Sequence, residues 1–169
     1  AMVENMLEND NILLVNQKFT IDMIDKIPKT TKIIYSGGLD ELLNYELGSL
    51  EYRSLEFEEL ALCRDSYQGC PVVNYTGAAT PFTRIIEHKY FMQETDRPDD
   101  FTIISKETAV NHIPGETIPY YPIGDAKNKE LHQQYVKLLS SKHDNIIPLG
   151  RLATYQYIDM DKTIELALD

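Results

Sequence analysis

The stretch from Pro81 to Phe91 combines cationic, aromatic and apolar residues in a pattern that could bind an anion. If it is a strand, alternation places four side chains on one face: Arg84, Ile86, His88 and Tyr90. A guanidinium in mid-strand offers a planar set of donors that matches phosphate oxygens. The alternative is a solvated sheet face on which Arg84 pairs with a glutamate, and the stretch alone leaves both interpretations open. For His88 we expect a hydrogen bond within the sheet.

The overall charge limits what such a face could bind. The 169 residues carry a net charge of -11, which argues against nucleic acid because a binder needs a cationic footprint to displace counterions. An anionic ligand would therefore be held by a few local groups. The hydrophobic fraction of 43% is typical of a globular protein with a sizeable core.

Cysteine, histidine and hydropathy patterns set further limits. Cys63 and Cys70 are expected to be reduced, and the four scattered histidines predict no metal site. No apolar run approaches the ~20 residues that span a bilayer, and no signal peptide opens the chain. These observations predict a cytoplasmic protein without membrane insertion.

The first and last thirds show the alternation of α/β units. We expect helices from about Val3 to Asn9 and over Leu39–Leu47, which Gly48 closes, and strands over Ile12–Val15 and Thr31–Tyr35. Near the other end, Asp125 should cap a helix with an apolar face of Leu131, Tyr135, Leu138 and Leu139. A strand over Asn145–Leu149 and a last helix from near Asp159, with Ile164 and Leu168 facing inward, complete the pattern.

The middle third predicts short strands joined by short turns, which is typical of an antiparallel sheet. The strands are Tyr52–Leu62 with a bulge near Glu58-Glu59, then Val72–Tyr75, Thr83–Phe91 and Phe101–Lys106. The fold class is therefore α+β, in three segments: an α/β segment over 1–48, an antiparallel sheet domain over 49–118, and a return segment over 119–169.

Several motifs together resemble the UDP-galactopyranose mutases, flavoenzymes that interconvert UDP-galactopyranose and UDP-galactofuranose. They are Gly48-Ser49-Leu50-Glu51-Tyr52-Arg53-Ser54-Leu55, Val73-Asn74-Tyr75 through Phe91, Pro119-Tyr120-Tyr121-Pro122, and Gly150 through Asp161. The resemblance implies that the sheet is a substrate-side domain of the kind found at the C-terminus of FAD-linked reductases. The flanking segments would then be remnants of an α/β FAD-binding domain.

The resemblance also implies roles for single residues. Arg84 and Tyr157 would contact the substrate diphosphate, together with Tyr121, or with Tyr120 if the register is shifted by one. Arg151 would lie beside the flavin. Asp159 would cap and position the last helix, whose N-terminus, at Met160 and Asp161, would face the flavin ring and favour its reduced form.

The implied chemistry belongs to reduced FAD rather than to a side-chain acid or base. In such enzymes flavin N5 attacks the anomeric carbon and displaces UDP, and the sugar ring opens and recloses without net redox. The product, galactofuranose, is used in cell wall polysaccharides. The protein would hold the diphosphate and align the flavin.

The chain departs from the family pattern in one respect. It contains no GxGxxG, so the turn that grips the FAD pyrophosphate is absent from it. We therefore expect a C-terminal portion of a mutase that binds little or no FAD and is inactive alone. It could self-associate as a homo-oligomer through an exposed apolar face. Two alternatives remain: a non-catalytic nucleotide-sugar binding module, and a fragment of another FAD-dependent, amine-oxidase-like enzyme.

Overall fold

The computed structural model describes residues 2–168. These residues divide into two compact units, the first ending at Thr31 and the second beginning at Lys32. The first unit holds helix α1 (Met2–Leu7) and the 3-10 helix η1 (Ile21–Lys26). The strand predicted over Ile12–Val15 is wrong: this segment has no strand partner among the described residues, and its four side chains are exposed. A short apolar run becomes a strand only where another strand pairs with it.

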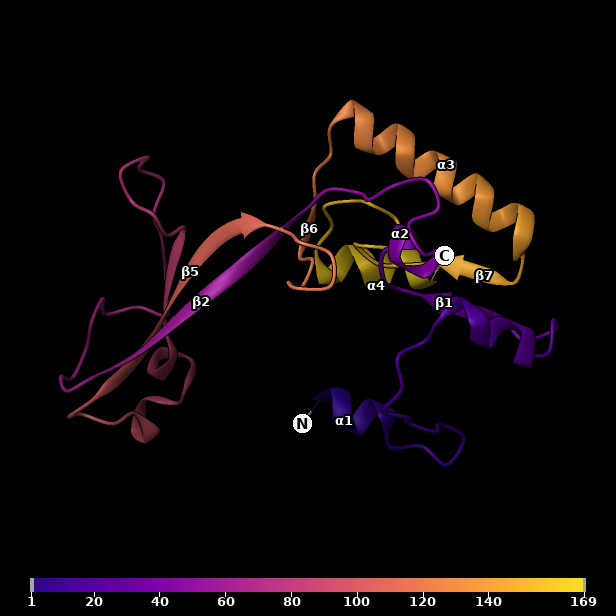
Figure 1. Ribbon diagram of the computed structural model, residues 1–169. Helices are drawn as coiled ribbons and strands as arrows, with labels where there is room; N and C mark the ends of the chain where they lie inside the picture. Colours follow the sequence, from indigo (N-terminus) through magenta and orange to yellow (C-terminus); the bar gives the residue numbers. More distant parts are fainter. Residues whose placement is uncertain (1, 169) are drawn as a thin grey trace. The chain divides into compact units, whose positions relative to one another are not determined.

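The second unit begins with a parallel strand pair made from distant parts of the chain. Strands β1 (Ile33–Tyr35) and β7 (Ile146–Pro148) pair with Ile33 opposite Ile146. This pairing joins the two end segments of the chain (Figure 1). Their assignment to an FAD-binding domain stays a prediction, as do the boundaries at 48 and 118.

Helix α2 (Leu39–Leu42) is shorter than the predicted Leu39–Leu47. Asn44 and Tyr45 adopt left-handed backbone conformations, with φ of 51° and 56°, which end the helix. Gly48 has φ of 99°, a conformation that glycine adopts without strain, but it lies six residues after the end of α2, so the predicted closing of the helix by this glycine is wrong.

Helix α3 (Ala126–Lys142) covers α2 and carries much of the core. The Asp125 side chain accepts the backbone N–H of Asn128 at 2.7 Å, which confirms the predicted cap. On the predicted apolar face, Tyr135 and Leu139 are fully buried, whereas Leu131 and Leu138 are partly buried. The Tyr135 hydroxyl donates to the Gly48 carbonyl at 2.5 Å, which ties the helix to the end of the α2 segment.

A five-stranded antiparallel sheet fills the middle of the chain, in the order β3-β4-β5-β2-β6. The strands are β2 (Tyr52–Leu62), β3 (Val72–Asn74), β4 (Arg84–Glu87), β5 (Thr102–Asn111) and β6 (Tyr121–Pro122). β2 and β5 form a long ribbon (Figure 1). Their pairing is continuous from Arg53 opposite Asn111 to Leu62 opposite Thr102, so the predicted bulge is wrong. The mixed class with an antiparallel sheet is confirmed.

β4 is shorter than the predicted Thr83–Phe91, and the chain turns into the 3-10 helix η2 (His88–Phe91) after Glu87. The strand ends here because Lys89 turns inward. Its ammonium donates to the Asp65 carboxylate and to the Pro98 carbonyl. The predicted shared face therefore breaks after Ile86, and Tyr90 is not part of it. His88 makes the hydrogen bond expected of it, with Nε2 2.7 Å from the Ser105 hydroxyl on β5.

The two faces of the sheet differ. One buries Ile85, Ile104, Glu87, Thr102 and Ser54. The opposite, open face carries Arg84, Phe57, Arg53 and Tyr121, which register and alternation place on one side. The open face is therefore the candidate wall for a ligand.

The remaining observations concern helix α4, a short 3-10 helix, the two cysteines, and features that the described residues lack. In helix α4 (Met160–Leu168) the predicted inward residues Ile164 and Leu168 are exposed, so this expectation is wrong for the described residues. A short 3-10 helix η3 (Glu94–Asp96) follows η2. Cys63 and Cys70 are free thiols. Within residues 2–168, no helix is long and apolar enough to cross a bilayer, and no three His, Cys, Asp or Glu side chains could jointly hold a metal ion.

Candidate functional site

Arg151 is the centre of a cation–aromatic cluster at the end of the chain. It follows Gly150, whose φ of 86° turns the chain after β7. Its guanidinium donates from Nε and Nη2 to the Ile158 carbonyl, at 2.9 and 2.7 Å. Nη2 also lies 3.5 Å from the Asp159 carboxylate. These contacts hold the guanidinium in one orientation, and 28% of the side chain stays exposed.

Two tyrosines from different segments complete this cluster. The rings of Tyr121, on β6, and Tyr157 are stacked with centroids 5.3 Å apart. The Arg151 guanidinium carbon lies 4.8 Å from the Tyr121 centroid and 5.2 Å from that of Tyr157. Such placement of a cation over aromatic rings is attractive. Because Tyr157 is 70% exposed, the cluster presents a hydroxyl-bearing aromatic surface to solvent.

The other predicted residues of the cofactor side lie next to the cluster. The Tyr120 ring is 6.4 Å from that of Tyr121. Asp159 accepts the N–H of Thr163 through its backbone carbonyl, at the start of α4. Met160 and Asp161, in the first turn of α4, are exposed. The structure therefore brings together the predicted residues from Tyr120 to Asp161.

Arg84 stands apart from this cluster. Its Nε donates to the Asn74 amide oxygen at 2.9 Å, and its Nη1 lies 3.6 Å from the Glu107 carboxylate. The sequence left open the possibility that Arg84 pairs with a glutamate on a solvated sheet face. The contact with Glu107 agrees with that alternative. The side chain is nevertheless 40% exposed, so a ligand can reach it.

The sheet register relates Arg84 to Tyr121. Arg84 is opposite Glu107, Glu107 is opposite Phe57, and Tyr121 is opposite Arg53 on the same strand as Phe57. The two positions are three strands and four residues apart, or about 20 Å between Cα atoms at ~4.8 Å per strand and ~3.3 Å per residue. They do not touch, but their side chains project from one face.

Arg53 is a residue of this face that sequence reasoning did not single out. It lies opposite Tyr121 and donates to the Asn111 side chain. Three of the five arginines of the chain thus stand on or beside the open face. The even separation of Arg53 and Phe57 along β2 places them on one side. Only the pairing with β5 and β6 shows that this side also carries Arg84 and Tyr121.

The residues of the cluster could hold the ring end of a flavin rather than its pyrophosphate end. Arg151 and the first turn of α4 offer positive charge and N–H groups, which suit an electron-rich ring. A pyrophosphate needs several convergent backbone N–H groups from a glycine-rich turn. No GxGxxG exists in the 169 residues, so this chain could supply only one side of an FAD site.

Comparison with known proteins identifies the family. The sequence pattern of the UDP-galactopyranose mutases matches residues 1–157. The chain belongs to this family. A probable UDP-galactopyranose mutase of Klebsiella pneumoniae is 38% identical over 168 residues, which are 99% of this chain and 42% of the relative.

Two more relatives show the range of the family. The dTDP-fucopyranose mutase of Escherichia coli is 33% identical over 173 residues, 99% of this chain and 45% of its own length. The UDP-galactopyranose mutase of Mycoplasma genitalium is 40% identical over 167 residues, 94% of this chain and 39% of its own length. The chain spans less than half the length of these relatives. Their names support a mutase-like function, and their activities belong to longer proteins.

Proposed function

We propose that this chain is the substrate-side portion of a UDP-galactopyranose mutase, in which it binds the diphosphate of a nucleotide sugar. The observation that carries the proposal is the open sheet face, with Arg84 at one side and, at the other, Arg53 next to the Arg151–Tyr121–Tyr157 cluster. Guanidinium groups and tyrosine hydroxyls are donors that match phosphate oxygens. They provide a local cationic surface on a chain of net charge -11.

A nucleotide sugar lying along this face would be held at several points. Arg84 and Tyr157 would donate to the diphosphate, and Tyr121 or Tyr120 would add a further hydroxyl. As UDP leaves, its phosphates gain negative charge. The side chains of Arg84 and Tyr157 would stabilise that charge. The contacts of Arg84 to Asn74 and Glu107 keep its side chain over the face before a ligand arrives.

The cofactor side would be shared with residues outside this chain. Arg151, Asp159, Met160 and Asp161 would contact the ring of reduced FAD. When bound, the reduced flavin would supply the nucleophile that displaces UDP from the sugar, without net redox. Arg151, fixed by the Ile158 carbonyl, would hold its positive charge near the ring. In this arrangement no side chain of this chain has to act as a general acid or base.

The experiment that tests the proposal is a titration of the chain with UDP, followed by amide NMR shifts at constant ionic strength. We expect saturable shifts around β4, β6 and Arg151. Arg84→Ala and Tyr157→Phe should each weaken binding about tenfold, because a hydrogen bond to a charged group contributes ~1.5–3 kcal/mol. Arg64→Ala is the matched control, since Arg64 also lies over a tyrosine ring, that of Tyr67, away from these residues.

The outcomes separate the candidate functions. No saturable UDP binding, or equal weakening by Arg64→Ala, would overturn the diphosphate assignment. Tighter binding of dTDP than of UDP would favour the activity named for the Escherichia coli relative. If the protein binds UDP and no activity of it requires flavin, the result would favour a non-catalytic nucleotide-sugar binding module.

The isolated chain is expected to be colourless and inactive as a mutase, because it lacks the glycine-rich turn for the FAD pyrophosphate. Absorbance near 450 nm, about where oxidised flavins absorb, and turnover of UDP-galactofuranose under reducing conditions measure this. A yellow sample that catalyses the reaction would show the expectation to be wrong.

A further inference from the structure

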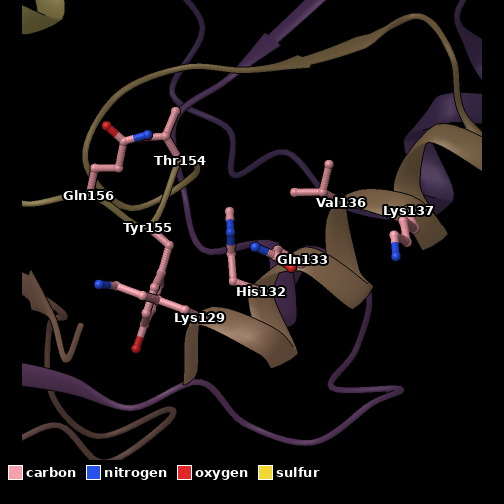
Figure 2. Close-up of a pocket in the computed structure, with 8 residues that line it drawn as sticks. All are labelled: Lys129, His132, Gln133, Val136, Lys137, Thr154, Tyr155 and Gln156. Atoms are coloured by element: carbon pink, nitrogen blue, oxygen red, sulfur yellow. The ribbon is translucent and has the colours of Figure 1, made fainter. Parts of the chain in front are cut away.

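A cavity of about 480 Å³ lies between helix α3 and the turn that contains Tyr155, apart from the residues of the proposed diphosphate site. In Figure 2, His132, Gln133, Val136 and Lys137 follow one another along helix α3, Thr154 and Gln156 lie on the turn, and the Lys129 side chain crosses Tyr155 in this view. The lining residues are Lys129, His132, Gln133, Val136, Lys137, Thr154, Tyr155 and Gln156. This volume lies within the range of small-molecule pockets, roughly 300–1,000 Å³.

The walls of the cavity are held in place by contacts that do not need a ligand. His132 Nε2 lies 2.9 Å from the Ala153 carbonyl, and its ring stacks on that of Tyr155 at 5.3 Å. The Tyr155 hydroxyl donates to the Glu51 carbonyl at 2.6 Å. The cavity is thus already formed, so a ligand need not order it.

The backbone of Tyr155 adds an independent signal. Its φ is 53°, a left-handed conformation that costs energy for a bulky aromatic residue. Such strain persists where the surroundings impose it, and it gathers at ligand sites. Here the conformation brings the side chains of Thr154 and Gln156 to the cavity while Tyr155 packs against His132.

The charges of the residues that line the cavity indicate which class of ligand it could bind. Two lysines line the cavity, and among residues 4–168 neither has an ion-pair partner. No carboxylate belongs to the described lining, although the chain has 27 acidic residues. The side chains of Gln133 and Gln156 add neutral donors, whereas the Thr154 hydroxyl donates to the Gly150 carbonyl at 2.8 Å. Ammonium groups with amide donors form a set that binds phosphate.

We propose that this cavity binds a small phosphate-bearing anion. The site uses Lys129 and Lys137 for charge and Gln133 and Gln156 for hydrogen bonds. It shares no residue with the open sheet face, so it stands or falls independently of the proposed function.

The test is a titration of the whole chain with inorganic phosphate, at constant ionic strength adjusted with sodium chloride. The readout is the NMR signals of the His132 ring and of the amides from Thr154 to Gln156. We expect saturable shifts confined to the cavity. The double variant Lys129→Gln/Lys137→Gln should weaken binding at least about fivefold, the equivalent of ~1 kcal/mol.

The matched control is Lys127→Gln/Lys142→Gln. It removes two charges from the same helix, but these lysines pair with Glu51 and Glu46 outside the cavity. This variant should bind phosphate as the parent does. Both double variants change exposed helix residues, and circular dichroism checks that they fold. Shifts that are absent, that never saturate, or that both variants weaken equally would overturn the proposal. Loss of phosphate binding in Tyr157→Phe would instead assign it to the open sheet face.

Discussion

At the residue scale, Glu87 shows how one buried carboxylate can anchor a turn to a sheet. It is fully buried at the end of β4 and accepts the N–H groups of Tyr67 and Gln68, each at 2.8 Å, and the Thr102 hydroxyl at 2.8 Å. Burial by itself raises the pKa of this carboxyl, but the backbone and hydroxyl donors outweigh it, and the pKa is lowered from 4.5. Glu87 therefore anchors the 66–69 turn to the sheet.

This pKa gives a prediction for acid stability. A lowered folded-state pKa contributes stability above about pH 4.5, and this contribution is lost as the pH falls towards the folded-state value. Glu87→Gln should reduce the free energy of unfolding by about 2 kcal/mol at pH 7, because Gln presents fewer acceptors to the same donors. The difference should shrink below pH 4.5. Urea unfolding at several pH values measures it.

Glu56→Gln is the control for that experiment, since Glu56 is exposed on β2. It should leave the free energy of unfolding unchanged within ~0.5 kcal/mol. A Glu87→Gln protein as stable as the parent at pH 7, or a difference that grows on acidification, would rule out the anchoring role.

At the element scale, α3 depends on its first turn. Asp125 accepts the Asn128 backbone N–H at 2.7 Å and also the Asn128 side-chain amide at 3.0 Å. Asn128 in turn accepts the N–H of Glu51 just before β2, which links the helix start to the sheet ribbon. The cap therefore orders two elements rather than one.

Loss of this cap should be measurable. Asp125→Ala should lower the free energy of unfolding by about 1 kcal/mol, the usual contribution of an N-cap, and thermal or urea unfolding measures it. Asp125→Asn keeps a capping oxygen and should stay within a few tenths of a kcal/mol of the parent. If Ala and Asn variants proved equally stable, the cap would not support this helix.

At the scale of the whole molecule, the parallel pair β1–β7 stands out because parallel sheets are normally covered on both faces. Ile34 and Ile147 are register partners on this pair, and both are exposed. The relatives are more than twice as long as this chain. An uncovered apolar pair of this kind favours self-association.

We therefore predict that the chain self-associates in a concentration-dependent way and that Ile34→Glu weakens this association. Analytical ultracentrifugation over a range of concentrations measures it. Phe91→Glu is the matched control, since Phe91 and Ile34 are each 65% exposed and Phe91 lies in η2, beside the antiparallel sheet. A monomer at all concentrations, or equal weakening by both variants, would refute this role for Ile34.

The sequence by itself determined the local features of this protein. Alternation predicted β2 over Tyr52–Leu62, and capping chemistry predicted the start of α3 at Asp125, because both depend on neighbouring residues. The motifs from Gly48 to Asp161 were sufficient for the family. They also named Tyr121, Arg151 and Tyr157, which the structure brings into contact.

Only the tertiary structure decided features that depend on distant partners. The segment Ile12–Val15 has the composition of a strand but no strand to pair with. β4 ends at Glu87 because Lys89 is drawn to Asp65, 24 residues away. Arg53 joins Arg84 on the open face through pairings that run across three strands, β4, β5 and β2. The sequence pattern contains the conformational propensity of each segment. Hydrogen-bond register and side-chain contacts depend instead on which segments pack against one another, and only the folded chain determines this.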